Sequence, residues 1–178
     1  MCAATYQIDG NESLTKLPDA PVMTAHQIHF LPDSTYFFTV CLEDRAATTL
    51  VDEIDRLRAA YAITVAEMPV HYHAMVILPN HLHAIWTEPG TPRFSERWRR
   101  IKARFSQSVT GDFKPNATKL RAGERGLLQR RFWEHAIRTP DDFQKAMDYC
   151  RTNPVTHGLV ATPEEWLYSS FTKACIAA

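Results

Sequence analysis

Two histidines separated by one leucine are the residues of this chain best suited to metal chemistry. They lie in the segment Pro79-Asn80-His81-Leu82-His83. Side chains two residues apart on a β-strand project from the same face, so a strand here presents two imidazoles side by side while Leu82 points into the opposite layer. Two neutral imidazoles at that spacing can bind one metal ion. The motif alone is more often two surface or hydrogen-bonded histidines than a metal site.

A second pair, His71 and His73, competes for the same role. If residues 79–80 form a two-residue turn, the hairpin register pairs Val76 with His83. That register puts the second pair on the opposite face, roughly 10 Å farther along the hairpin at ~3.3 Å per residue. We therefore expect no four-histidine zinc site, an inference that fails if the register shifts by one residue.

A candidate nucleophile, Tyr149, lies on a segment with clear helix signals. Thr139 can cap the helix and Pro140 suits its first position. The helix should end at residues 153–154, because the residue before a proline is pushed out of helical angles. Tyr149 and Asn153 are four residues apart and therefore one above the other, on the flank of the apolar stripe. Packing at the edge of the core, with the hydroxyl in water, is the alternative role for this tyrosine.

Positive charge is concentrated in one part of the chain. The chain has 20 Lys+Arg and 20 Asp+Glu, but residues 93–131 hold 12 basic and 3 acidic side chains, a net charge of +9. Residues 1–92 carry 4 basic and 11 acidic side chains (−7), and residues 132–178 carry 4 and 6 (−2). The zero total argues against a nucleic-acid-binding protein, whereas the local excess indicates a polyanionic partner. The candidate phosphate-binding side chains are Arg97, Arg99, Arg100, Lys102, Arg104, Arg130 and Arg131.

Together these features would suit the cleavage of a phosphodiester by a tyrosine nucleophile. A metal ion on the two histidines would polarise the scissile phosphate, and the phenolate would attack in line. The intermediate would be a phosphotyrosine, which conserves bond energy so that the strand can be rejoined.

The elements that must position these residues follow from the hydrophobic pattern. Aromatic and β-branched runs predict strands, and apolar residues at three- and four-residue spacing predict helices. The expected strands are 35–42, 71–78, 81–87 and one within 127–139, and the expected helices are 48–61, 95–109 and 140–153. This order describes an α+β fold, a ferredoxin-like antiparallel sheet with helices packed mainly on one face. Residues 1–32 are interpreted as an N-terminal arm, and residues 33–178 as one domain.

Composition limits the classes of protein that fit. A hydrophobic content of 45% is enough to bury a real core, and no apolar run approaches the ~20 residues of a membrane helix. The four cysteines are widely spaced and form no Cys-x-x-Cys pair, so they suggest neither a zinc knuckle nor a disulfide framework. A cytoplasmic protein with no membrane partner is expected.

Four segments, taken in order, resemble the REP-associated tyrosine transposases. These are single-tyrosine nucleases of the His-hydrophobic-His superfamily and relatives of small insertion-sequence transposases. The segments are residues 78–86, 97–102, 131–138 and 148–160, and the resemblance runs from about residue 36 to residue 171.

The resemblance implies a function and a site. His81 and His83 would be metal ligands, Tyr149 the nucleophile, and Asn153 the residue that completes the metal site. The family uses Mg²⁺ or Mn²⁺, although ligand chemistry alone would have suggested zinc. Its members bind single-stranded DNA palindromes that fold into hairpins, cut beside them through a 5′-phosphotyrosine and transfer the strand. The resemblance to REP-associated members also implies a monomer rather than a dimer.

The chain also departs from the family pattern, and other functions remain open. Family members usually have a basic, Gly-containing segment before the first strand, associated with a guide tetranucleotide, whereas residues 24–33 contain no arginine. A DNA-hairpin binding protein that no longer cuts is the main alternative, and a relaxase or replication initiator is disfavoured by the short single domain. Trp98 and Trp133 are candidates for stacking on unpaired bases, but Trp98 shares the apolar face of its helix, which favours core packing.

Overall fold

The computed structural model describes residues 33–111, 113 and 125–172, so the N-terminal arm expected at residues 1–32 lies outside the described residues. The four strands are β1 (Thr35–Cys41), β2 (His71–Ile77), β3 (His81–Thr87) and β4 (Trp133–Ile137). All neighbouring strands pair antiparallel, in the order β2-β3-β1-β4. This topology confirms the expected ferredoxin-like α+β sheet.

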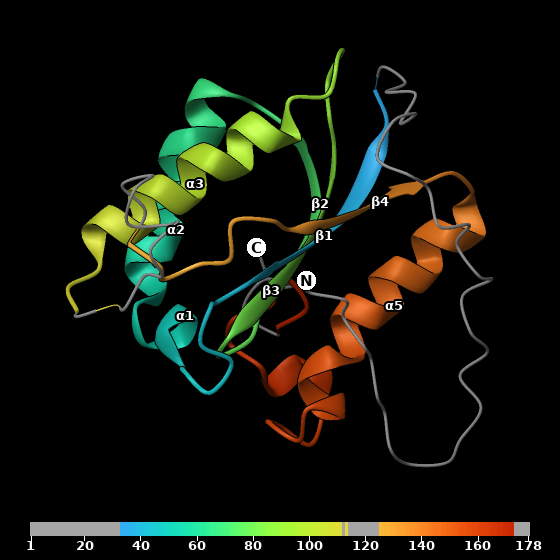
Figure 1. Cartoon of the computed structure of the whole chain (residues 1–178). Helices are drawn as coiled ribbons and strands as arrows, with labels where there is room; N and C mark the ends of the chain where they lie inside the picture. The colour runs from blue at the N-terminus through green and yellow to red at the C-terminus, as the bar shows by residue number, and fades with distance from the viewer. Residues whose placement is uncertain (1–32, 112, 114–124, 173–178) are drawn as a thin grey trace.

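The helices divide between the two faces of this sheet (Figure 1). They are α1 (Thr49–Asp52), α2 (Ile54–Glu67), α3 (Phe94–Ser108), α5 (Pro140–Thr156) and the short 3₁₀ helix η1 (Pro163–Glu165). The first three cover one face, as expected for helices packed mainly on one side, and α5 covers the other. In the part of the chain that the structure describes, no helix combines the length and apolar character needed to cross a membrane.

Alternation along β1 builds two separate cores. Tyr36, Phe38 and Val40 point toward α2 and α3, where they join the larger apolar cluster. Trp98 of α3 is buried in this cluster, 4.9 Å from the Trp86 ring, so the expectation of core packing is correct. A large aromatic core fixes α3 against the sheet, because burying each such ring stabilises the fold by about 1.5–3 kcal/mol.

The smaller core lies under α5. Phe37, Ile85 and Cys150 meet there, together with Val76 and Leu78 of the β2–β3 hairpin. Cys150 is fully buried, and burial raises the pKa of its thiol to about 12, so this cysteine acts as a small apolar anchor for α5. The helix is thereby held close to the strand that carries the paired histidines.

The hairpin register is correct near its turn and differs beyond a bulge. The amide of Leu78 donates to the carbonyl of His81 (2.8 Å), and Val76 pairs with His83, as expected for a two-residue turn. A bulge at His73 then shifts the pairing, so that His71 opposes Thr87. The prediction that His71 and His73 lie on the face opposite His81 and His83 is therefore wrong, because one extra residue in a strand reverses every side chain beyond it. His73 instead contacts Phe143 of α5.

Helix α5 also continues past the proline that was expected to end it. Pro154 lies within the helix, which runs to Thr156. The chain leaves the helix at Gly158, whose φ of 66° is left-handed, and the amide of Leu159 donates back to the carbonyl of Pro154 (2.9 Å). A proline this near the end removes only one helical hydrogen bond, so a glycine-terminated last turn still forms.

Candidate active site on the α5 face

The paired histidines lie together beneath α5. β3 directs both imidazoles to this face, with ring centroids 5.1 Å apart. Their side chains are almost completely buried, with His81 3% and His83 1% exposed. The interpretation as ordinary surface histidines is therefore excluded.

Each imidazole has a hydrogen-bonding partner on its Nδ1 atom. His83 Nδ1 hydrogen-bonds with Thr39 Oγ1 at 2.9 Å, and His81 Nδ1 with Asn80 Oδ1 at 2.6 Å. Such partners fix the orientation and tautomer of metal-binding histidines and leave the Nε2 atoms for the ion. Thr39 and Asn80 thus support the histidine pair. The two-residue period of β1 turns Thr39 toward the same face, and Asn80 lies in the turn directly before His81.

Burial also sets the charge state of the pair. Desolvation, helped by the neighbouring His81 imidazole, lowers the pKa of His83 to about 3. Desolvation and the nearby His157 lower the pKa of His81 to about 4. Both rings are therefore neutral at pH 7, with the lone pairs that a metal ion requires.

Two buried polar atoms here have no hydrogen-bond partner. They are His83 Nε2 and Asn153 Oδ1, and Asn153 is 3% exposed. An unsatisfied buried polar atom costs about 1–3 kcal/mol, so two of them in one site point to a missing ligand. A nitrogen and a carboxamide oxygen suit a divalent cation, so these residues fit the metal that the resemblance implies. Within the described residues, no three His, Cys, Asp or Glu side chains are grouped to hold a metal.

Tyr149 lies one helical turn before Asn153 and packs against His83. Its ring centroid is 5.1 Å from that of His83 and 5.8 Å from that of Phe37, both in edge contact. The side chain is 39% exposed, so part of the phenol faces solvent. The structure therefore brings together the four residues expected at the site.

His157 is a neighbour that the sequence reasoning missed. It follows Asn153 by one more turn, and its ring lies 5.1 Å from His81. The four-residue spacing of Tyr149, Asn153 and His157 was visible in the sequence. The expectation that the helix stops at Pro154 concealed it.

Arg97, one of the expected DNA-binding residues, is internal. It is 2% exposed and its guanidinium forms an ion pair with the buried carboxylate of Glu88. The Nε atom also donates to the Met68 carbonyl (3.0 Å), and Trp86 Nε1 donates to Glu88 (2.7 Å). A charge satisfied in this way cannot reach a phosphate, so the expectation of a DNA contact is wrong for this residue. Its place in the apolar stripe of α3 was the available signal.

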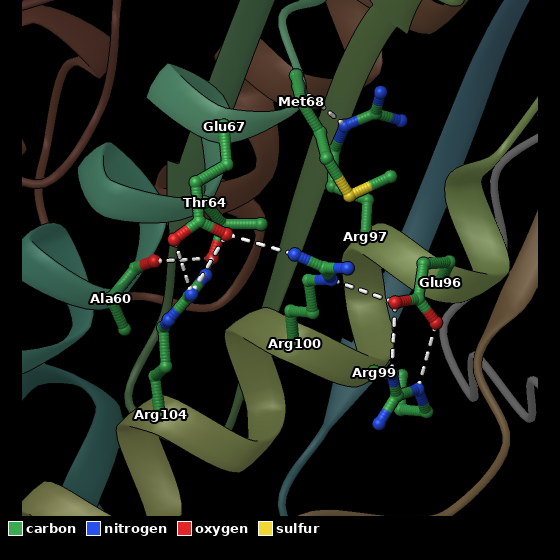
Figure 2. Close-up of polar contacts among 9 residues, drawn as sticks. All are labelled: Ala60, Thr64, Glu67, Met68, Glu96, Arg97, Arg99, Arg100 and Arg104. Atoms are coloured by element: carbon green, nitrogen blue, oxygen red, sulfur yellow. Dashed lines mark hydrogen bonds and ion pairs between the residues drawn. The ribbon is translucent and has the colours of Figure 1, made fainter.

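Three other arginines of α3 form a network with two glutamates (Figure 2). Arg99 and Arg100 both bind Glu96, and Arg100 and Arg104 both bind Glu67, at 2.6–2.9 Å. Exposed ion pairs of this kind contribute little to stability, so these arginines could exchange the glutamates for another anion at small cost. This helix lies on the face opposite the histidines.

A groove runs between α3 and the segment leading into β4. Its cavity volume is about 260 Å³. The lining includes Arg99, Lys102, Arg125, Arg130 and Phe132. Lys102 Nζ donates to the carbonyls of Gln129 and Arg130 (3.0 and 2.6 Å) and so ties the two walls together. Arg130 and Arg131 are exposed at its end.

Fold and site together define a class of protein, an α+β domain in which a His-Leu-His strand faces a helix tyrosine. Comparison with known proteins finds relatives across most of the chain, although no family model matches. A REP-associated tyrosine transposase of Escherichia coli K12 is 36% identical over 150 residues, 84% of this chain and 83% of that protein. A Haemophilus influenzae protein assigned to the same family is 37% identical over 153 residues, covering 84% and 86%.

A solved structure gives the same result. The structure of a REP-associated tyrosine transposase bound to a REP hairpin has a TM-score of 0.69 and 35% identity, covering 84% of this chain and 83% of that one. The chain belongs to the family of REP-associated tyrosine transposases.

Proposed function

We propose that this protein is a metal-dependent endonuclease and strand transferase for single-stranded DNA with hairpin-forming palindromes. The observation that carries the proposal is the contact of Tyr149 with His83, beside the unsatisfied atoms His83 Nε2 and Asn153 Oδ1. A protein that only binds hairpins has no need for a nucleophile next to buried, neutral ligands.

The proposed metal ligands are His81, His83 and Asn153, and the proposed ion is Mg²⁺ or Mn²⁺. Mn²⁺ accepts imidazole more readily than Mg²⁺ does, which suits two nitrogen ligands. When bound, the ion would polarise a non-bridging oxygen of the scissile phosphate. The protein holds the ligands neutral, oriented and out of bulk water.

In the proposed reaction Tyr149 supplies the attacking oxygen. Its phenolic oxygen forms a bond to phosphorus and gives up its proton, while the bond between phosphorus and the 3′-oxygen breaks. The leaving 3′-oxygen takes up a proton from water. The products are a 5′-phosphotyrosine and a free 3′-hydroxyl, and attack by a second 3′-hydroxyl reverses the step and transfers the strand.

The DNA partner is proposed from the relatives together with the charge of α3 and its neighbours. The related structure contains a REP hairpin. In this chain Arg99, Arg100, Lys102 and Arg104, with Arg130 and Arg131, are the residues proposed to contact hairpin phosphates. Arg97 is left out of this set because it is buried against Glu88.

A single chain is proposed to be the active unit. Tyr149 contacts a histidine of its own chain, so no second copy is needed to complete the site. We also propose a cytoplasmic location, because the proposed DNA substrate is there.

A covalent-adduct assay tests the function. Labelled hairpin DNA with single-stranded flanks, incubated with Mn²⁺, should yield a protein–DNA adduct that survives denaturation. Tyr149→Phe should abolish the adduct. Tyr72→Phe is the matched control, since Tyr72 is a similarly exposed tyrosine (45%) on β2, and it should leave the adduct unchanged. Hairpin binding with no adduct, across several metals and sequences, would instead indicate a protein that no longer cuts.

A further inference from the structure

An exposed tryptophan lies at the start of β4, beside the proposed active site. Trp133 exposes 53% of its surface, whereas Trp86 and Trp98 are buried. An indole left half in water forgoes much of the stabilisation that its burial would provide, and a flat exposed ring is suited to stacking. Its surroundings show what it could stack on.

The ring is held from two sides. His135 lies two residues along the strand, and its ring is nearly parallel to that of Trp133 (interplanar angle 6°, centroids 5.9 Å apart). His135 Nε2 in turn hydrogen-bonds with Asp142 of α5 at 2.9 Å. On the other side, Trp133 makes an edge contact with Phe37 (5.7 Å, 72°). The ring is therefore oriented before any ligand arrives, which lowers the entropy cost of binding.

The same contacts connect Trp133 to the active site. Phe37 also contacts the rings of His83 (5.2 Å) and Tyr149 (5.8 Å). In the sheet register Trp133 opposes Thr39, the residue that hydrogen-bonds with His83. Trp133 thus shares the α5 face with the proposed nucleophile, and β1 lies between it and the histidine pair.

Trp133 lies where a DNA strand would pass from the basic groove to Tyr149. The basic groove beside α3 lies on the opposite face of the sheet, and its wall includes Phe132, the neighbour of Trp133. β4 is at the end of the strand order, so its outer side is an edge of the sheet. A strand whose phosphates lie in the groove can reach Tyr149 around this edge, and there it meets Trp133 just after the exposed Arg131.

We propose that Trp133, supported by His135, is a stacking platform for one unpaired base of the substrate strand, close to the phosphate that Tyr149 attacks. Every base has a π-face, so the platform would position the strand without reading its sequence. Trp133 is then a positioning residue. The inference rests on the proposed function, since it takes single-stranded DNA as the ligand.

Base-by-base fluorescence tests the platform. The DNA is a hairpin with single-stranded flanks that carries one 2-aminopurine at a time, at each unpaired position. The protein carries Tyr149→Phe so that the DNA stays intact. We expect strong quenching at one position close to the cleavage junction. Adding Trp133→Ala should remove that quenching and weaken affinity about 5- to 150-fold, whereas Trp133→Phe should retain most of both.

Two controls separate this inference from the proposed function. Leu167→Ala removes a more exposed apolar side chain (69%). Leu167 is near Ser169, which bridges to β2 at the other edge of the sheet. This variant should change neither the quenching nor the affinity. A blunt hairpin without flanks should bind equally well to the Trp133→Ala protein and its parent. Hairpin binding that is intact, with quenching and affinity unchanged by Trp133→Ala, would overturn the platform alone. Failure of the parent to bind any hairpin would overturn the proposed function and the platform together.

Discussion

Individual atoms carry the argument for a metal site. His83 Nε2 and Asn153 Oδ1 are buried without partners, while His83 Nδ1 is satisfied by Thr39. Had both nitrogens of His83 been hydrogen-bonded within the protein, the ring would be a structural residue of the core. The unsatisfied atoms instead mark where a cation would stabilise the folded state.

Metal binding should therefore stabilise the protein without any DNA. At a Mn²⁺ concentration 100 times its dissociation constant, the free energy of unfolding should rise by about 2.7 kcal/mol, because the ion binds only the folded state. Thermal unfolding with and without Mn²⁺ measures the effect. Asn153→Ala should reduce it strongly, and Gln144→Ala, an exposed amide on the same helix, should not. An equal Mn²⁺ effect in both variants would exclude Asn153 as a ligand.

The stability of the metal-free protein should fall at acid pH. The pKa values of His81 and His83 are lowered in the folded state to about 4 and about 3, from the ordinary histidine value of 6.5. Between pH 6.5 and 4 the unfolded chain therefore binds more protons, and stability is lost as pH falls through this window. Urea unfolding at pH 7.5 and pH 5 measures the loss, and His83→Gln should make it smaller. A loss that His83→Gln leaves unchanged would place its origin in other groups.

The site residues were predictable because each of them depends on a short-range periodicity. His81 and His83 follow the two-residue period of a strand, and Tyr149 and Asn153 the four-residue spacing of a helix. Thr39 could not be predicted as the partner of His83, because the strand period gives only the face on which each side chain lies, and their contact also depends on the pairing of β1 with β3. Sequence spacing says little about contacts between distant segments.

At the scale of elements, a buried ion pair attaches α3 to the sheet. Arg97 lies on the buried face of the helix, and its partner Glu88 follows directly after β3. Glu88 also accepts from the amide of Arg93, one residue before α3 begins (3.0 Å). The same helix thus carries one structural arginine and several surface ones.

Removing the two kinds of arginine should have different consequences for stability. Arg97→Met leaves the Glu88 carboxylate buried and unpaired, so the free energy of unfolding should fall by about 3–5 kcal/mol. Arg99→Met, which breaks the exposed pair with Glu96, should cost less than about 1 kcal/mol. Urea denaturation of both variants gives the comparison. Similar losses would show that Arg97 is not held as the structure indicates.

Two elements differ from the sequence expectations for local reasons. The bulge at His73 changes which face of β2 carries His71, and nothing in the alternation of His71-Tyr72-His73 marks an extra residue. Helix α5 continues past Pro154, which near the helix end removes a single hydrogen bond, and it ends only where Gly158 takes a left-handed φ. In both places one residue decides a boundary, and the rest of each element follows its hydrophobic period.

On the scale of the whole molecule, the zero net charge conceals a separation between the surface cations and the candidate active site, which lie on different faces of the sheet. The cations of α3 and the groove lie on one face, and the histidines with Tyr149 lie on the other. Helix α3, the described part of the basic segment with residues 125–131, falls between the candidate metal pair and the candidate nucleophile in sequence, yet in space it lies across the sheet from α5 (Figure 1). Under the proposed function, DNA bound on one face would have to reach Tyr149 on the other.

Hairpin affinity should depend steeply on salt despite the neutral total. Each neutralised phosphate contributes a slope of about −0.9 in a plot of log affinity against log salt for duplex DNA. Arg99→Gln and Arg130→Gln should each make the slope shallower by about one. Arg100→Gln would do the same, whereas Arg97→Met, compared under conditions where it is folded, should leave the slope unchanged. A nearly flat titration of the unaltered protein would contradict the assigned DNA-binding surface.

The most direct test of the central claim is to identify the residue that becomes covalently attached to DNA. After reaction with hairpin DNA and Mn²⁺, nuclease trimming and trypsin digestion, mass spectrometry should find the remaining nucleotides on the peptide 146–151, which contains Tyr149 between Lys145 and Arg151. Fragmentation should place the phosphate on the tyrosine oxygen. An adduct on any other residue, or cleaved DNA without an adduct, would contradict the account.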